Sequence, residues 1–187
     1  MNIVIVGAGG HAKLLVEIAH ARGDRIVAYV DPKPAPWLEA PYIADEEKFD
    51  DRGAAFVVGV GGITPEKLEL RLAMADRWIA RGFAAATLVH PSAVVSASAR
   101  IEAGVAILAQ SVVQPSAVVG RAAIINTAAV VEHDASVGEG SHVAPGAIVL
   151  GDVRIGRCCM IGSGAIVLQG TEVAPLTLVK ASVAEKS

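Results

Sequence analysis

A histidine with a carboxylate on either side stands in the C-terminal half of the chain, in the run Val131-Glu132-His133-Asp134. A histidine with an ordinary pKa of about 6.5 can accept a proton at neutral pH. A neighbouring carboxylate can fix its tautomer and stabilise the imidazolium form. Any single one of the five histidines would by default be an ordinary surface residue. The motif around His133 favours the alternative, a general base.

A glycine-rich turn near the N-terminus is the second candidate for chemistry. The sequence GAGGHA at residues 7–12 fits the loose pattern G-x-G-x-x-A, and Asp31 ends the next apolar run. Glycines let a phosphate approach the backbone, and the start of the following helix attracts its charge. A full dinucleotide fold needs two β-α-β-α-β halves, and this region has room for one. The turn therefore predicts a nucleoside diphosphate site, with a small NAD-linked oxidoreductase as an alternative that rests on the turn alone.

Residues 1–88 must position that turn. Apolar runs predict strands at Ile3–Val6, Ile26–Val30 and Ala55–Val60, and helices at His11–Arg22 and from Thr64 to Gly82. Thr64 and Pro65 form a typical helix start. The residues expected on the buried helix faces are Leu14, Leu15, Ile18 and Ala19, then Leu68, Leu72, Ala75 and Ile79. The β-α-β-β-α-β order predicts a small Rossmann-like parallel sheet with flanking helices.

From Val89 onward the apolar pattern has a period of six. Val or Ile occupies every sixth position to Val179, and a small residue follows each one four places later. Neither a helix nor a plain strand has this period, which indicates a repeat architecture. One hexad makes a short strand and a corner, and three make one coil stacked on its neighbours. Residues 89–187 are therefore predicted to form a parallel β-helix of about five coils.

The composition narrows the classes of protein to which this chain can belong. The 187 residues are 53% apolar and 4% aromatic with a net charge of −3, which gives no support to nucleic-acid binding. The longest uncharged runs contain His, Pro or Gly, so no membrane span is predicted. The N-terminus lacks a basic stretch before its apolar run, so no signal peptide is expected and the location is predicted to be cytoplasmic. The adjacent Cys158 and Cys159 cannot form an ordinary disulfide framework.

The hexads, the N-terminal GAGGHAK and the central INTAAVVEHDASVGEGSHVAPGA together resemble one family. It is the left-handed β-helix sugar acetyltransferases of the PglD-like and NeuD-like group. The resemblance implies a nucleotide-sugar-binding α/β domain joined to a left-handed β-helix, with three subunits in a homotrimer. It does not extend to residues 179–187, where relatives usually add a Gly-x-Pro-Ala-Lys motif that helps hold coenzyme A.

The resemblance also implies roles for individual residues. His133 would be the base and Asp134 its acidic partner, while the Gly151 N–H would face the acetyl oxygen and His142 would lie near the acetyl group. Asn126 would face the acceptor sugar. The N-terminal residues expected near the pyrophosphate, sugar and nucleotide are Gly9, Gly10, His11, Asp31 and Gly61. For Asn126, His142 and Gly151, an ordinary corner or turn residue remains the alternative.

The sequence therefore predicts an acetyl-CoA-dependent N-acetyltransferase acting on a nucleotide-linked 4-amino sugar in bacterial glycan biosynthesis. One alternative is an O-acetyltransferase acting on sialic acid or another surface sugar. Another is a non-catalytic trimeric scaffold that binds a sugar nucleotide. No metal is expected: the zinc enzymes among β-helix proteins use three histidines, whereas His133 and His142 are half a coil out of phase and no third histidine follows.

Overall fold

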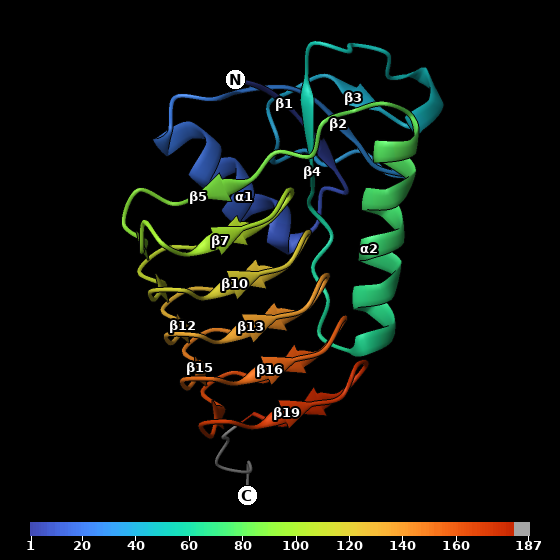
Figure 1. The fold of residues 1–187 in the computed structure, drawn as a ribbon. Helices are drawn as coiled ribbons and strands as arrows, with labels where there is room; N and C mark the ends of the chain where they lie inside the picture. The colour runs from blue at the N-terminus through green and yellow to red at the C-terminus, as the bar shows by residue number, and fades with distance from the viewer. Residues whose placement is uncertain (182–187) are drawn as a thin grey trace, which may run out of the picture.

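The computed structural model describes residues 1–181. The α/β unit lies at the N-terminal end of a parallel β-helix, and its long second helix runs down alongside the coils (Figure 1). Residues 182–187, the end of the segment that lacks the relatives' coenzyme A motif, lie outside the described residues.

A parallel four-stranded sheet forms the α/β unit, with strand order β3-β2-β1-β4. Its elements are β1 (Asn2–Val6), α1 (Gly10–Ala21), β2 (Arg25–Val30), β3 (Tyr42–Ile43), a 3-10 turn (Glu46–Lys48), β4 (Ala55–Val58) and α2 (Pro65–Ala80). The central strand β1 is buried from Ile3 to Val6. Each predicted strand and helix of residues 1–88 is present, so the Rossmann-like sheet is confirmed.

Three details differ from the sequence prediction. The sheet has an additional edge strand, β3, whose two residues are too few to carry a periodic pattern. Leu14 is 41% exposed because the buried stripe of α1 runs through Ala12, Leu15 and Ala19, about a quarter turn away. Ile79 is 44% exposed, and its predicted place is taken by Trp78, which is fully buried in an aromatic cluster with Phe49, Phe56 and Phe83.

The β-helix has three faces, each a parallel sheet of two-residue strands. The first face contains β5 (Leu88–Val89), β8 (Ala106–Ile107), β11 (Ile124–Ile125), β14 (His142–Val143), β17 (Met160–Ile161) and β20 (Leu178–Val179). The second face contains β6 (Val94–Val95), β9 (Val112–Val113), β12 (Val130–Val131), β15 (Ile148–Val149) and β18 (Ile166–Val167). The third face contains β7 (Arg100–Ile101), β10 (Val118–Val119), β13 (Ser136–Val137), β16 (Arg154–Ile155) and β19 (Glu172–Val173).

The hexad pattern explains this architecture. The second residue of every strand is the Val or Ile of a hexad, and these side chains fill the interior together with the small residues that follow four places later. Three places after the branched residue the corner turns through a positive φ, as at Gly146 (66°) or Ala128 (55°). The predicted left-handed β-helix of about five coils is confirmed. Strand β5 straddles the predicted domain boundary between residues 88 and 89, which itself stays a prediction.

The α/β unit packs on the first face of the β-helix. Leu88, Ala106 and Ile124 share a buried cluster with Leu15 of α1. Met160 of the same face belongs to a cluster with α2 and the other side of the sheet. The start of α1 and the glycine loop before α2 meet the first face near Asn126 and His142.

Candidate active site

His133 and Asp134 lie at the corner between β12 and β13, where the chain passes from the second face to the third. The Nδ1 atom of His133 lies 2.8 Å from Asp134 Oδ2. Asp134 has a left-handed φ of 61°. This hydrogen bond places the Nδ1 proton toward the carboxylate, which leaves Nε2 as the basic nitrogen.

The charge around His133 is strongly negative. The hydrogen bond to Asp134 raises the pKa of His133, and the charges of Asp134, Glu132 and Asp152 raise it further, whereas desolvation lowers it. The imidazole is exposed on the surface of the single chain. It is therefore a reachable base that is stabilised in its protonated form.

Gly151 lies one coil beyond His133 and directly against its ring. A Cβ atom on Gly151 would lie 2.8 Å from His133 Cε1 and 2.9 Å from Nε2. Within residues 1–181, no acceptor bonds the Gly151 N–H. The structure thus brings His133, Asp134 and Gly151 together. A backbone N–H without a partner, on a residue that packs against the base, is a group that can bind a developing oxyanion.

A second group of predicted residues meets on the first face. Gly10, His11, Gly61, Asn126 and His142 line one cavity of about 410 Å³. The other residues that line it are Leu14, Gly62, Ile63 and Lys67. This cavity, called the acceptor pocket below, lies between the starts of α1 and α2 and the strand β14.

Hydrogen bonds fix the tautomer of His142 in this pocket. Thr127 donates its N–H to Asn126 Oδ1 at 2.8 Å, so the amide nitrogen of Asn126 faces His142 Nε2 at 2.9 Å. His142 Nε2 must therefore accept, and Nδ1 donates to the carbonyl oxygen of Gly62 at 2.7 Å. Burial lowers the pKa of His142, and nearby Arg71 lowers it further, so the ring is neutral. This series of hydrogen bonds joins the β-helix to the glycine loop after β4.

His11 lies at the start of α1 and is also neutral. Burial, then the charge of Arg71, then His142, lower the pKa of His11 to about 3. Its Nε2 atom is buried and has no hydrogen-bond partner among the described residues. Gly61 packs against it, and a Cβ there would lie 3.2 Å from His11 Cβ. The glycine therefore leaves room for the imidazole.

Asp31 and Gly9 lie outside the acceptor pocket. Asp31 accepts hydrogen bonds from Ala8 N–H at 2.8 Å and Lys33 N–H at 2.9 Å. It lines a separate cavity of about 520 Å³ with Gly7 and Val60, at the carboxyl ends of the parallel strands. Gly9 is the N-cap residue of α1. Ligands of open α/β sheets bind at this end of the strands.

The two groups of predicted residues are far apart within one chain. The acceptor pocket lies on the first face, whereas His133 lies at the corner between the second and third faces. In a three-sided prism that corner is opposite the first face. His133 and His142 therefore lie on different sides, as the sequence spacing predicts.

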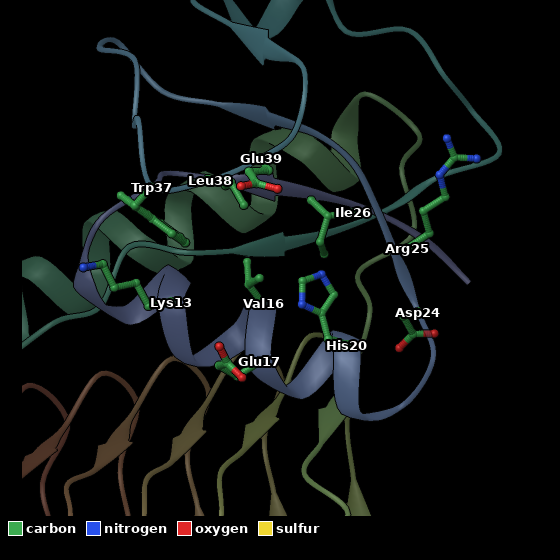
Figure 2. Close-up of a pocket in the computed structure, with 10 residues that line it drawn as sticks. All are labelled: Lys13, Val16, Glu17, His20, Asp24, Arg25, Ile26, Trp37, Leu38 and Glu39. Atoms are coloured by element: carbon green, nitrogen blue, oxygen red, sulfur yellow. The ribbon is translucent and has the colours of Figure 1, made fainter.

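A further cavity of about 550 Å³ contains none of the predicted residues. It lies between α1 and the loop that carries Trp37 (Figure 2), with Lys13, Glu17 and His20 along the helix.

Within residues 1–181, no group of three or more His, Cys, Asp or Glu is placed to hold a metal. Of the helices in that part of the chain, none has the length and apolar content to cross a membrane.

Sequence reasoning missed Lys67 and Arg71, both on α2. Lys67 lines the acceptor pocket in the first turn of the helix, where a cation is disfavoured by the helix dipole. That mismatch was the available signal for Lys67. Arg71 gives no signal, because a charged residue within a helix is ordinarily solvent-exposed.

Comparisons with known proteins agree with the fold and its two parts. Residues 2–65 match the family described as PglD N-terminal domain, and residues 134–169 match bacterial transferase hexapeptide (six repeats). UDP-N-acetylbacillosamine N-acetyltransferase of Bacillus subtilis (strain 168) is 36% identical over 118 residues. That match covers 58% of this chain and 51%, about half, of the Bacillus protein.

Solved structures match nearly the whole chain. The acetyltransferase domain of PglB from Neisseria gonorrhoeae FA1090, in complex with acetyl coenzyme A, is 31% identical with a TM-score of 0.89, covering 99% of this chain and 90% of that one. PerB from Caulobacter crescentus, in complex with CoA and GDP-perosamine, is 31% identical with a TM-score of 0.79, covering 99% and 96%. The chain belongs to the PglD-like family of hexapeptide-repeat acetyltransferases.

Proposed function

We propose that this protein is an acetyl-CoA-dependent N-acetyltransferase that acts on the amino group of a nucleotide-linked 4-amino sugar in bacterial glycan biosynthesis. The observation that carries the proposal is the His133–Asp134 pair, whose basic nitrogen lies against the backbone of Gly151. The relatives support both substrates, since one was solved with acetyl coenzyme A and another with CoA and GDP-perosamine. The cytoplasmic location predicted from the sequence is part of this proposal.

The residues present suit direct transfer in a ternary complex. The neutral amine attacks the thioester carbonyl carbon, forming a C–N bond, while His133 Nε2 takes the proton that the nitrogen loses. The Gly151 N–H donates to the carbonyl oxygen as it becomes negative. The C–S bond then breaks, and the imidazolium returns its proton to the leaving thiolate of coenzyme A. Asp134 holds the imidazole in the required tautomer and stabilises its charged form.

The acceptor pocket is proposed to hold the sugar nucleotide. Asn126 and His142 offer polar groups from the β-helix, and Gly10 and His11 offer the start of α1 for the diphosphate. The nucleoside would extend along the strand ends toward Asp31. His142 is held by Asn126 and Gly62, so within this chain it positions the pocket. The sequence prediction that it lies near the acetyl group stays a prediction.

The second face supports a homotrimer. Its outward residues are all β-branched and apolar: Val94, Val112, Val130, Ile148 and Ile166. Val94 is 63% exposed and Ile166 is 56% exposed in the single chain. The outward residues of the third face are mostly polar, as at Arg100, Ser136 and Glu172. Burial of the apolar column between three subunits would remove it from water.

A trimer would also join the two groups of site residues. Because the acceptor pocket and His133 lie on opposite sides of one chain, the acceptor held by one subunit would meet His133 of the neighbouring subunit. Coenzyme A would lie in the groove between the two β-helices. The substitution Ile148→Glu tests this directly: it should convert a trimer to monomers in analytical ultracentrifugation and abolish transfer. A variant that remains trimeric would count against the second face as the interface.

Complementation tests the shared site. His133→Ala removes the base, and Asn126→Leu damages the acceptor pocket without touching His133. Trimers of either variant alone should be nearly inactive, whereas mixed trimers should regain part of the wild-type rate because some sites combine an intact pocket with an intact base. Mixed trimers as inactive as the parents would contradict a site shared between subunits.

A further inference from the structure

A fully buried arginine lies on α2, one turn after the acceptor-pocket residue Lys67. Arg71 of α2 is 1% exposed, and its Nη1 donates a hydrogen bond to the carbonyl oxygen of Ala122. Its Nε has no hydrogen-bond partner among the described residues. No carboxylate within residues 1–181 forms an ion pair with it. Buried arginines are ordinarily paired.

The neighbouring groups do not neutralise this charge. The carboxylates of Glu69 and Asp76 on the same helix pair with Arg157 and Arg121 of the β-helix instead. Cys158 lies close enough to act on the charge of Arg71, but burial raises the pKa of that thiol, which keeps it uncharged. Burial lowers the pKa of Arg71 to about 10, so the guanidinium is still protonated at neutral pH. The protonated guanidinium therefore has no ion-pair partner within residues 1–181.

Such a charge disfavours folding. An unpaired buried cation loses its hydration, and a well-packed apolar side chain of similar volume is often the more stable choice. The hydrogen bond to one backbone carbonyl satisfies only part of the guanidinium. A negative charge bound nearby would offset this cost.

The acceptor pocket is where that anion would lie. Lys67 lines the pocket, and Arg71 follows it by one turn on the same side of α2. The charge of Arg71 lowers the pKa of both His11 and His142, which line the pocket, as a nearby cation would. The start of α1 contributes its free N–H groups on the other side. Since both histidines are neutral, the positive charge at this pocket comes from Arg71 and Lys67.

We propose that Arg71 is a binding determinant for the diphosphate of the sugar nucleotide, acting as a buried positive charge on α2, the helix that borders the acceptor pocket. The inference rests on the proposed function only for the identity of the ligand. Lys67 is near the surface, so its attraction is screened by salt, whereas that of a buried charge is screened much less. Measurements at two ionic strengths can therefore separate the contribution of Lys67 to diphosphate affinity from that of Arg71.

The test is binding, which needs no turnover. The probes are UDP-N-acetylglucosamine and GDP-mannose, whose diphosphate diesters keep their charge between pH 6 and 8, measured by calorimetry at low and high salt. Arg71→Met and Arg71→Gln remove the charge, and the Gln variant can still donate to Ala122 O. Arg71→Lys keeps the charge. Arg100→Gln, an exposed change on the third face, is the matched control.

Arg71→Met and Arg71→Gln should each lower the affinity for the probe by about tenfold or more. This is the size of effect expected for the loss of one unit charge near the diphosphate, at the effective dielectric constant of a protein. The loss should persist at high salt, and Arg71→Lys should recover most of it. Thermal stability of the unliganded Met or Gln variant should equal or exceed that of the wild type, which a purely structural role would not permit. Unchanged affinity, a loss that follows a fall in stability without rescue by Lys, or no binding of either probe to the wild type would overturn the proposal. Failure of acetyl transfer alone would refute the proposed function and leave this binding result intact.

Discussion

The substitution Gly151→Ala tests how the base is positioned. The added Cβ would lie 2.8 Å from His133 Cε1 and 2.9 Å from Nε2, where ordinary contacts are 3.4–4 Å. The imidazole must therefore move by roughly 1 Å, and a misplacement of that size can cost about a hundredfold in rate. Gly151 is not among the glycines with a positive φ, so alanine adds no left-handed strain. Alanine also keeps the backbone N–H, so the oxyanion donor is not removed.

The assay is release of free thiol from acetyl-CoA at saturating acceptor, on protein whose oligomeric state matches the wild type. Gly151→Ala should lower kcat by about a hundredfold with little change in the affinity for the sugar nucleotide, because the acceptor pocket lies on another face. Gly53→Ala in the α/β unit is the matched control, since Gly53 has no positive φ and an added Cβ there would meet only the Asp51 side chain. A Gly151→Ala trimer with an unchanged kcat would refute the placement of His133 over Gly151.

Two further predictions concern pH and stability. The hydrogen bond to Asp134 raises the pKa of His133 above its ordinary 6.5, and the base is active only when unprotonated, so kcat/KM should rise with pH through an inflection above that value. Asp134→Asn should move the inflection to lower pH and lower the plateau of kcat/KM. An unmoved inflection would contradict the pairing of His133 with Asp134. Gly146 has a φ of 66°, so Gly146→Ala should destabilise the protein by about 1 kcal/mol in chemical denaturation at fixed protein concentration. Ala128 has a φ of 55°, so Ala128→Gly should not destabilise it. Equal losses of stability in both variants would argue against left-handed corners.

The β-helix was the most predictable part of the chain, for a physical reason. Each hexad places one branched residue inside a narrow prism, and a single slip would expose every later one, so Val89 to Val179 keep one phase. The parallel sheet followed from apolar runs long enough to be recognised, such as Ile3–Val6. Strand β3 did not, because Tyr42–Ile43 is held by pairing with β2 rather than by its own pattern.

The site was less predictable because its groups depend on packing between distant segments. Trp78 rather than Ile79 is buried because its ring completes an aromatic cluster drawn from three other segments. The neutral state of His142 depends on Gly62, 80 residues away. Arg71 is buried only because the first face of the β-helix covers that side of α2. None of these contacts leaves a local signal in the sequence.

Thiol release from acetyl-CoA with a panel of acceptors tests the central claim most directly. The panel contains UDP-, GDP- and dTDP-linked 4-amino-4,6-dideoxy sugars, together with free and CMP-linked sialic acid. We expect turnover with one nucleotide-linked amino sugar, accompanied by an N-acetylated product, and a loss of several orders of magnitude in kcat for a trimeric His133→Ala variant. Turnover with sialic acid alone, no turnover with any acceptor, or a His133→Ala variant of near-normal rate would contradict the account.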